Sequence, residues 1–177
     1  MTSRPLAIEL DLDEIRAVTG FAARCATRVL PLSEDQHPDD DRPRAAIDAA
    51  LAFAGGGRRT NALRTAAFEA LRAASSAGSP AAAEAARAAG HAAGAAFLHP
   101  LAQATQVKHI VGSAAYAARA AELAADDNRA VGEGAVVWAR ENVPGTVVAV
   151  LRRYPVAPGG GGRVGELVRM LDALLRA

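Results

Sequence analysis

Apolar residues recur along most of this chain at the three- and four-residue spacing of an α-helix. The clearest repeat follows Asp11 and Glu14, whose spacing is typical of residues that cap a helix N-terminus. Its apolar positions are Ile15, Val18, Thr19, Ala22, Ala26 and Val29. Proline disrupts a helix interior, so we expect this first helix to end at Pro31.

The same pattern, interrupted by proline, glycine and capping residues, predicts seven further helices. Their expected ranges are 43–54, 60–74, 80–98, 101–125, 129–142, 145–153 and 163–176. We therefore predict an all-α fold without a sheet, as a compact single-domain bundle of seven to eight Ala-rich helices. The expected domain spans residues 1–177 and has its core in residues 11–154.

The last predicted helix is strongly amphipathic and follows a glycine-rich segment, residues 155–162, that is typical of a flexible linker. Its apolar side is formed by Val164, Leu167, Val168, Leu171, Leu174 and Leu175. Such a stripe needs burial, so we expect residues 163–176 to dock on the core. A short tether favours docking on the same chain, and a swapped homodimer is the alternative.

Alanine occupies 46 of the 177 positions and is densest between Ala62 and Ala125. Because alanine is the best helix former and its side chain is small, this density favours closely packed helices. Charge is balanced, with 20 basic and 19 acidic residues, whereas nucleic-acid binders usually carry a basic face. The chain has no membrane-length apolar run, and Cys25, its single cysteine, suits the reducing cytoplasm in which we expect the protein.

The histidines are the first candidates for chemistry, but their spacing argues against a metal site. His91 and His99 are eight residues apart, and Pro100 separates both from His109. Helical spacing puts His91 on an exposed polar stripe with Glu84 and Arg87. On the next helix the polar stripe would hold Thr105, Lys108, Arg119 and Glu122.

His109 and Tyr116 would share one flank of that helix, as a recognition patch or simply as a boundary between helices. The loop 55–60 is rich in glycine but lacks the Gly-Lys-Ser/Thr end of a phosphate-binding loop. Cys25 has no nearby His or Lys in sequence and is expected to be a buried filler. We therefore predict no catalytic residue, no metal and no cofactor.

The most unusual polar segment joins the first two helices and is strongly acidic. Its charged residues are Glu34, Asp35, Asp39, Asp40, Asp41, Arg42 and Arg44. The structural interpretation, which we favour, is a solvated linker in which Asp41 caps the next helix. In the alternative, Arg42 or Arg44 pairs with acidic groups and pins the loop. With His91, His109 and Tyr116, these residues form the candidate partner-binding set.

Several stretches, taken in order along nearly the whole chain, resemble the putative immunity protein family of bacterial polymorphic toxin systems. They are residues 25–32, 41–47, 88–92, His109, 112–116, Trp138 with Pro144, and 165–167. Each motif is built from common residues, so their order carries the resemblance.

The resemblance implies a non-catalytic, all-helical protein that protects its own cell by binding a cognate toxin. An acidic loop facing a basic toxin is compatible with that role. A structural or oligomerisation module is the alternative and would show a large apolar self-interface. An enzyme or nuclease-associated protein is less favoured and would need a deep cleft lined by His91, His99 and His109.

Overall fold

Capping residues set where most of the helices begin. Asp11 and Glu14 form a reciprocal capping box, in which each carboxylate accepts a hydrogen bond from the other residue's backbone N–H. The side chains of Thr60, Ser79 and Asn128 each accept a backbone N–H at the start of a later helix. These starts agree with the sequence prediction.

The computed structural model describes residues 6–177, and its described part is 72% helix with no strand, so the predicted all-α class is confirmed. Nine α-helices follow one another along the described chain: α1 (Leu12–Thr27), α2 (Leu30–Glu34), α3 (Arg42–Ala54), α4 (Asn61–Ser75), α5 (Pro80–Gly94), α6 (Val107–Ala124), α7 (Arg129–Asn142), α8 (Gly145–Leu151) and α9 (Gly162–Arg176). Short 3₁₀ turns cover Ala95–Phe97 and Ala104–Gln106.

Three boundaries differ from the sequence prediction, all near proline. The helix expected to reach residue 98 ends at Gly94 and is followed by the 3₁₀ turn Ala95–Phe97. The first helix ends at Thr27, and Pro31 lies in the first turn of α2, where a missing N–H costs nothing. The helix expected from residue 101 begins only at Val107. The preceding segment is extended and pairs with the N-terminal segment through an isolated bridge between Ala7 and Leu101.

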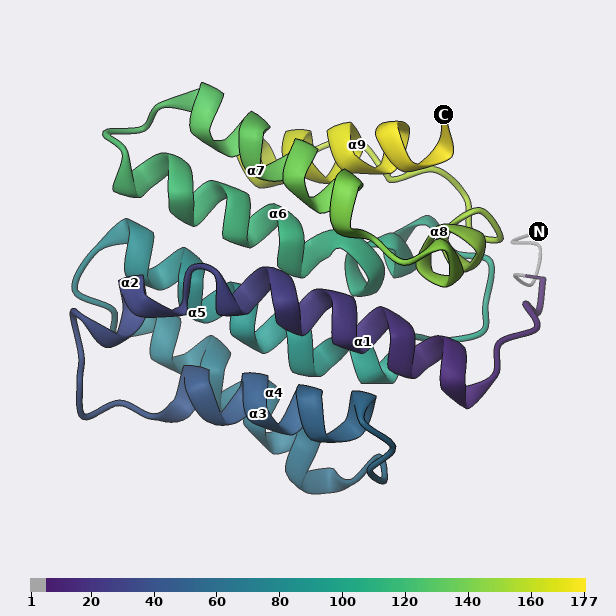
Figure 1. Cartoon of the computed structure of the whole chain (residues 1–177), viewed down its shortest axis with the longest axis horizontal. Helices are drawn as coiled ribbons and strands as arrows, with labels where there is room; N and C mark the ends of the chain where they lie inside the picture. The colour runs from purple at the N-terminus through teal and green to yellow at the C-terminus, as the bar shows by residue number, and fades with distance from the viewer. Residues whose placement is uncertain (1–5) are drawn as a thin grey trace.

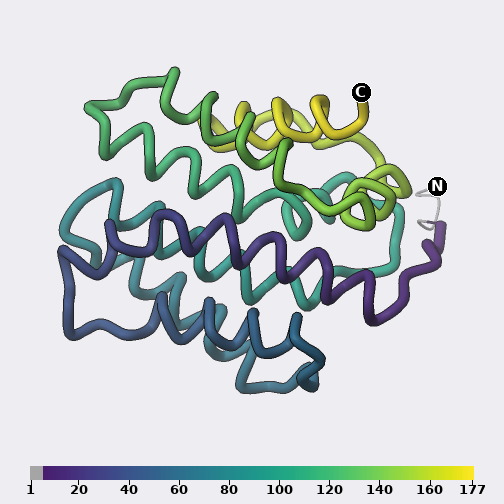
Figure 2. Tube along the Cα trace, in the orientation of Figure 1, coloured from purple at the N-terminus to yellow at the C-terminus, as the bar shows by residue number. Residues whose placement is uncertain are grey.

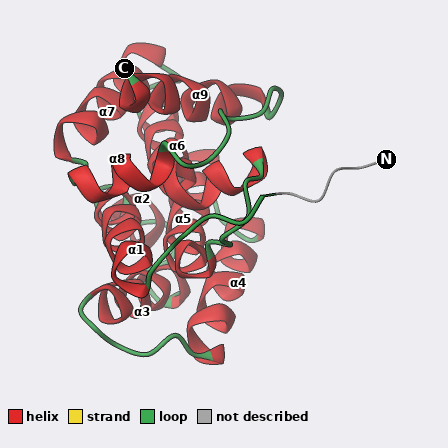
Figure 3. Cartoon of the chain, turned by 90° about the vertical axis from the view of Figure 1, so that its right-hand side faces the viewer, coloured by secondary structure: helices red, strands yellow, loops and turns green. Residues whose placement is uncertain are grey.

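The helices form two layers, which Figure 3 shows end-on: α3, α1, α8 and α7 in one, and α4, α5, α6 and α9 in the other. Figure 1 shows the first of these layers from the front. Helix α5 packs against α1, α2, α3, α4 and α6 and is the central helix of the bundle. Its buried residues are all alanine or glycine, which explains how five helices can surround it.

Helices α4 and α5 approach each other closely at Gly90 of α5. A Cβ atom there would lie 2.8 Å from Cδ2 of Leu71 and 3.0 Å from the carbonyl oxygen of Ala67, both on α4. Glycine is therefore required for α4 and α5 to pack at this distance.

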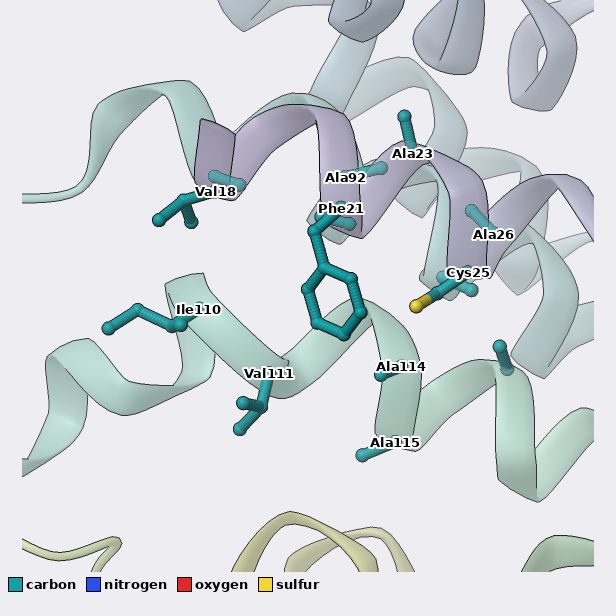
Figure 4. Packing of buried hydrophobic residues seen from close by; sticks show 14 of the residues in the cluster. Val18, Phe21, Ala23, Cys25, Ala26, Ala92, Ile110, Val111, Ala114 and Ala115 are labelled. Carbon is teal, nitrogen blue, oxygen red and sulfur yellow. The ribbon is translucent and has the colours of Figure 1, made fainter. Parts of the chain in front are cut away.

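Helices α1 and α6 supply several of the larger side chains of the core, among them Phe21 and Ile110. Figure 4 shows Phe21 between the two helices and the sulfur of Cys25 pointing toward Ala114 of α6. Cys25 is 2% exposed, and burial raises the pKa of its thiol to about 12, so it is the buried filler that we expected. The hydroxyl of Ser113, also on α6, lies within hydrogen-bond distance of the carbonyl oxygens of Ala22 and Ala88.

The C-terminal helix α9 packs on α6 and α7 of the same chain. Leu167, Val168, Leu171 and Leu175 are buried there. The glycine-rich segment before α9 is held along it, because Arg169 donates hydrogen bonds to the carbonyl oxygens of Pro158 and Gly160. The carboxylate of Asp172 accepts a further hydrogen bond from the backbone N–H of Ala157.

Candidate protein-binding surface

The acidic segment joins α2 to α3 at one end of the bundle. Figure 2 shows that the connections 35–41, 76–79 and 125–128 all lie at this end. The loop packs on the α4–α5 connection, where a Cβ atom on Gly78 would be 3.1 Å from Oε1 of Gln36. Arg42 reaches the same connection, with Nη2 at 3.4 Å from Oγ of Ser76.

Two arginine–carboxylate pairs hold the loop in place. Arg42 donates from Nε and Nη2 to the two oxygens of Asp40, at 2.8 and 2.7 Å. Arg44 donates in the same way to Glu34, ten residues earlier, at 2.5 and 2.8 Å. The alternative sequence interpretation, in which Arg42 or Arg44 pairs with acidic groups and pins the loop, is therefore the observed one, and both arginines form such a pair.

The favoured interpretation was wrong in one detail, because Asp41 precedes α3 without accepting a hydrogen bond from it. The backbone of Asp41 already has helical angles, so its side chain does not point back at the first turn. Instead Asp40 accepts from the backbone N–H of Arg42, at 3.2 Å. Its hydrogen bonds from the Arg42 side chain hold the pKa of Asp40 below its ordinary value.

The remaining acidic side chains of the loop face solvent. Asp35, Asp39 and Asp41 are exposed, and none of them forms an ion pair within residues 6–177. The two paired carboxylates thus fix the loop, while three unpaired ones give it a negative surface. This arrangement can attract and orient a basic partner.

The other three candidate residues form a separate cluster, about three helical turns along α5 from the loop. His91 of α5 stacks on Tyr116 of α6, with ring centroids 4.5 Å apart. His91 was predicted to be exposed, but it is largely covered, and burial lowers its pKa to about 4. Sequence reasoning missed this because α6 covers the stripe that α5 alone would show to solvent.

His109 lies at a boundary between helices, one of the two roles that its position in the sequence allowed. Its Nδ1 lies 3.0 Å from the carbonyl oxygen of Gly94 and donates to it, which ties α6 to the end of α5. Burial lowers the pKa of His109, and this effect is larger than the opposite effect of its hydrogen bond to Gly94. His99 is exposed, and its carbonyl oxygen accepts a hydrogen bond from the Tyr154 hydroxyl, at 2.7 Å. The three histidines therefore make different contacts.

No group of three or more His, Cys, Asp or Glu side chains in the described part of the chain could share a metal ion. Across residues 6–177, no helix is both long and apolar enough to cross a membrane.

A buried charge network was also missed, although Glu122 belonged to the predicted polar stripe of α6. Glu122 is 0% exposed, and it accepts hydrogen bonds from Arg119 of its own helix and from Arg163 of α9. The hydrogen bonds to Glu122 hold the pKa of Arg163 above its ordinary value. The partner lies 41 residues away, so no local spacing indicates the pair.

A model of one protein family matches residues 9–146, more than three quarters of the chain, and is described as "Imm-5 like putative immunity protein". The chain belongs to this immunity protein family. The matched region includes the acidic loop, the His91–Tyr116 stack and helices α1 to α7 of this family member. Comparison with curated proteins and with solved structures gives no match, so the assignment rests on the family match alone.

Proposed function

We propose that this protein is a non-catalytic immunity protein that binds a cognate toxin and thereby neutralises it. Membership of the immunity protein family supports the role in general terms. The acidic loop is the surface that we propose binds the toxin, because its two arginine–carboxylate pairs hold the exposed carboxylates in a fixed arrangement. A pre-organised surface loses little conformational entropy on binding.

The partner chemistry follows from the charge of this loop. Five carboxylates and two guanidiniums lie between Glu34 and Arg44, so the loop is net negative. A toxin with a basic face, as nucleases that act on polyanions have, would be drawn to it and held in register. Loop and partner would then associate rapidly at low salt and more slowly as salt screens the charges.

Survival in cells tests the proposed role. The toxin encoded next to this gene is expressed in bacteria with and without the protein, and colony formation is counted. We expect survival only when the protein is present. Death in both cultures, with both proteins present in soluble form, would contradict the proposal.

Association kinetics test the surface. Changing Asp35 and Asp39 to Asn leaves both arginine pairs intact and removes two negative charges. The control changes Glu9 and Glu141, which are exposed and lie outside the loop, to Gln. We expect the loop variant to lower the association rate several-fold at low salt and the control to leave it near the original value. Equal rates for both variants would remove the loop from the contact surface.

A further inference from the structure

An apolar groove lies on the opposite side of α1 from α3. Helices α1 and α7 both pack on α6 but make few contacts with each other, and Figures 1 and 3 show α6 behind the space between them. Alanines of α6, among them Ala118 and Ala121, form the floor. Cys25 of α1 and Trp138 of α7 form the two walls.

The groove contains a pocket of about 120 Å³, close to the volume of engineered cavities that take up benzene. Because alanine lines its floor, the pocket suits one large apolar side chain from a partner. The guanidinium of Arg28 lies over the Trp138 ring, 3.7 Å from its centroid, at the edge of this pocket. Trp138 is the only tryptophan of the chain and is half-buried there.

The charges on the α1 side of the pocket are positive. Arg24 and Arg28, at the C-terminal end of α1, are exposed and form no ion pair within the described residues. Arg24 spans between the helices, because its Nη2 donates to the carbonyl oxygen of Asn142 at 3.1 Å. A partner segment that places an apolar side chain in the pocket would meet these cations with its flanking residues.

Gly134 gives an independent indication of a partner. It is exposed within α7, one turn before Trp138, and a Cβ atom there would have no neighbour within 4 Å. Glycine destabilises a helix interior by about 1 kcal/mol relative to alanine, and no contact within residues 6–177 requires glycine at this position. A bare backbone at this position permits another helix to approach α7 closely.

We propose that the groove between α1 and α7 is a second docking site, which binds an acidic amphipathic helix of a partner protein. One large apolar side chain of that helix enters the pocket beside Trp138, and the carboxylates of the helix face Arg24 and Arg28. The acidic loop attracts the opposite charge, so this site goes beyond the proposed toxin contact and can fail without affecting it.

Two synthetic helical peptides test the proposal. Both have the same leucine face, and the residues beside that face are glutamates in one peptide and lysines in the other. The emission of Trp138 reports binding directly. We expect saturable binding of the glutamate peptide that weakens with salt, and little binding of the lysine peptide. Equal binding of both peptides, or binding of neither, would overturn the proposal.

Variants locate the bound peptide. Ala121→Leu fills the pocket, and Ala52→Leu makes the same change on the exposed face of α3. We expect binding to weaken about tenfold or more in the first and to stay unchanged in the second. Gly134→Ala changes only the surface and should also weaken binding. Unchanged binding in both Ala121→Leu and Gly134→Ala would overturn the proposal. So would a wild-type homodimer that Ala121→Leu dissociates, because a second copy would then occupy the groove.

Discussion

Two glycines of α7, Gly132 and Gly134, should respond to alanine with opposite changes in stability. A Cβ atom on Gly132 would lie 2.2 Å from Oε1 of Glu122 and 2.4 Å from its Cδ and Cγ. Glu122 is fully buried and cannot swing into solvent. It would have to move away from Arg163, which donates to it from Nε at 3.0 and 3.2 Å and from Nη2 at 2.5 Å.

The magnitude follows from these contacts. Overpacking a core typically costs about 1–3 kcal/mol, and breaking a buried ion pair costs about 3–5 kcal/mol. Alanine returns about 1 kcal/mol through its better helix propensity. If Glu122 shifts but keeps part of its pairing, Gly132→Ala should lower the free energy of unfolding by about 2–4 kcal/mol. Gly134→Ala meets no atom and should raise it by about 0.5–1 kcal/mol.

Urea unfolding followed by circular dichroism measures both changes, and the emission of Trp138 provides a second probe of the same transition. The two variants have the same composition and alter the same helix, so the comparison isolates the contact with Glu122. A Gly132→Ala protein as stable as Gly134→Ala would refute the buried position assigned to Glu122.

Three further predictions concern other parts of the fold. Deleting residues 163–177 removes four buried apolar side chains and leaves Glu122 without Arg163. The melting temperature should therefore fall by roughly 10 °C or more, and the exposed core should bind a hydrophobic dye. An unchanged melting curve would mean that α9 does not stabilise the core. Burial lowers the pKa of His91 from its ordinary value of 6.5 to about 4 in the folded protein. Between these two pH values only the unfolded chain protonates His91, so the free energy of unfolding falls as the pH is lowered through that range. In urea unfolding measured from pH 7 to pH 4, His91→Phe should lose up to about 3 kcal/mol less free energy of unfolding than the original protein. Parallel pH profiles of the two proteins would contradict the burial of His91. Ala88→Leu on the central helix should cost about 1–3 kcal/mol or more, whereas Ala52→Leu on exposed α3 should be close to neutral in the same assay.

Local signals explain the part of the fold that could be predicted from the sequence. The capping residues Thr60, Ser79 and Asn128 act within their own helical turns. The start of α5 was predicted from Ser79 with Pro80, and the starts of α4 and α7 were predicted within a residue of their observed positions. The short helix α2 was missed because its proline was taken as a stop, although proline also suits a first turn.

Features that depend on distant segments were not predictable in this way. Glu122 has a polar helical spacing, and the packing of α7 and α9 against α6 buries it. His91 was placed on an exposed stripe because its neighbour Tyr116 comes from another helix. The acidic residues of the first loop were identified as a group, but the choice of Glu34 as the partner of Arg44 depends on how α2 and α3 meet.

The central claim is that the protein acts by binding and has no catalytic turnover. Titrating a fixed amount of the purified toxin with this protein tests it most directly, with toxin activity as the readout. The account predicts that activity falls in proportion to the protein added, ends at a fixed stoichiometric ratio, and returns in full when the complex is dissociated. Complete and irreversible loss of activity at a small fraction of that ratio would contradict it.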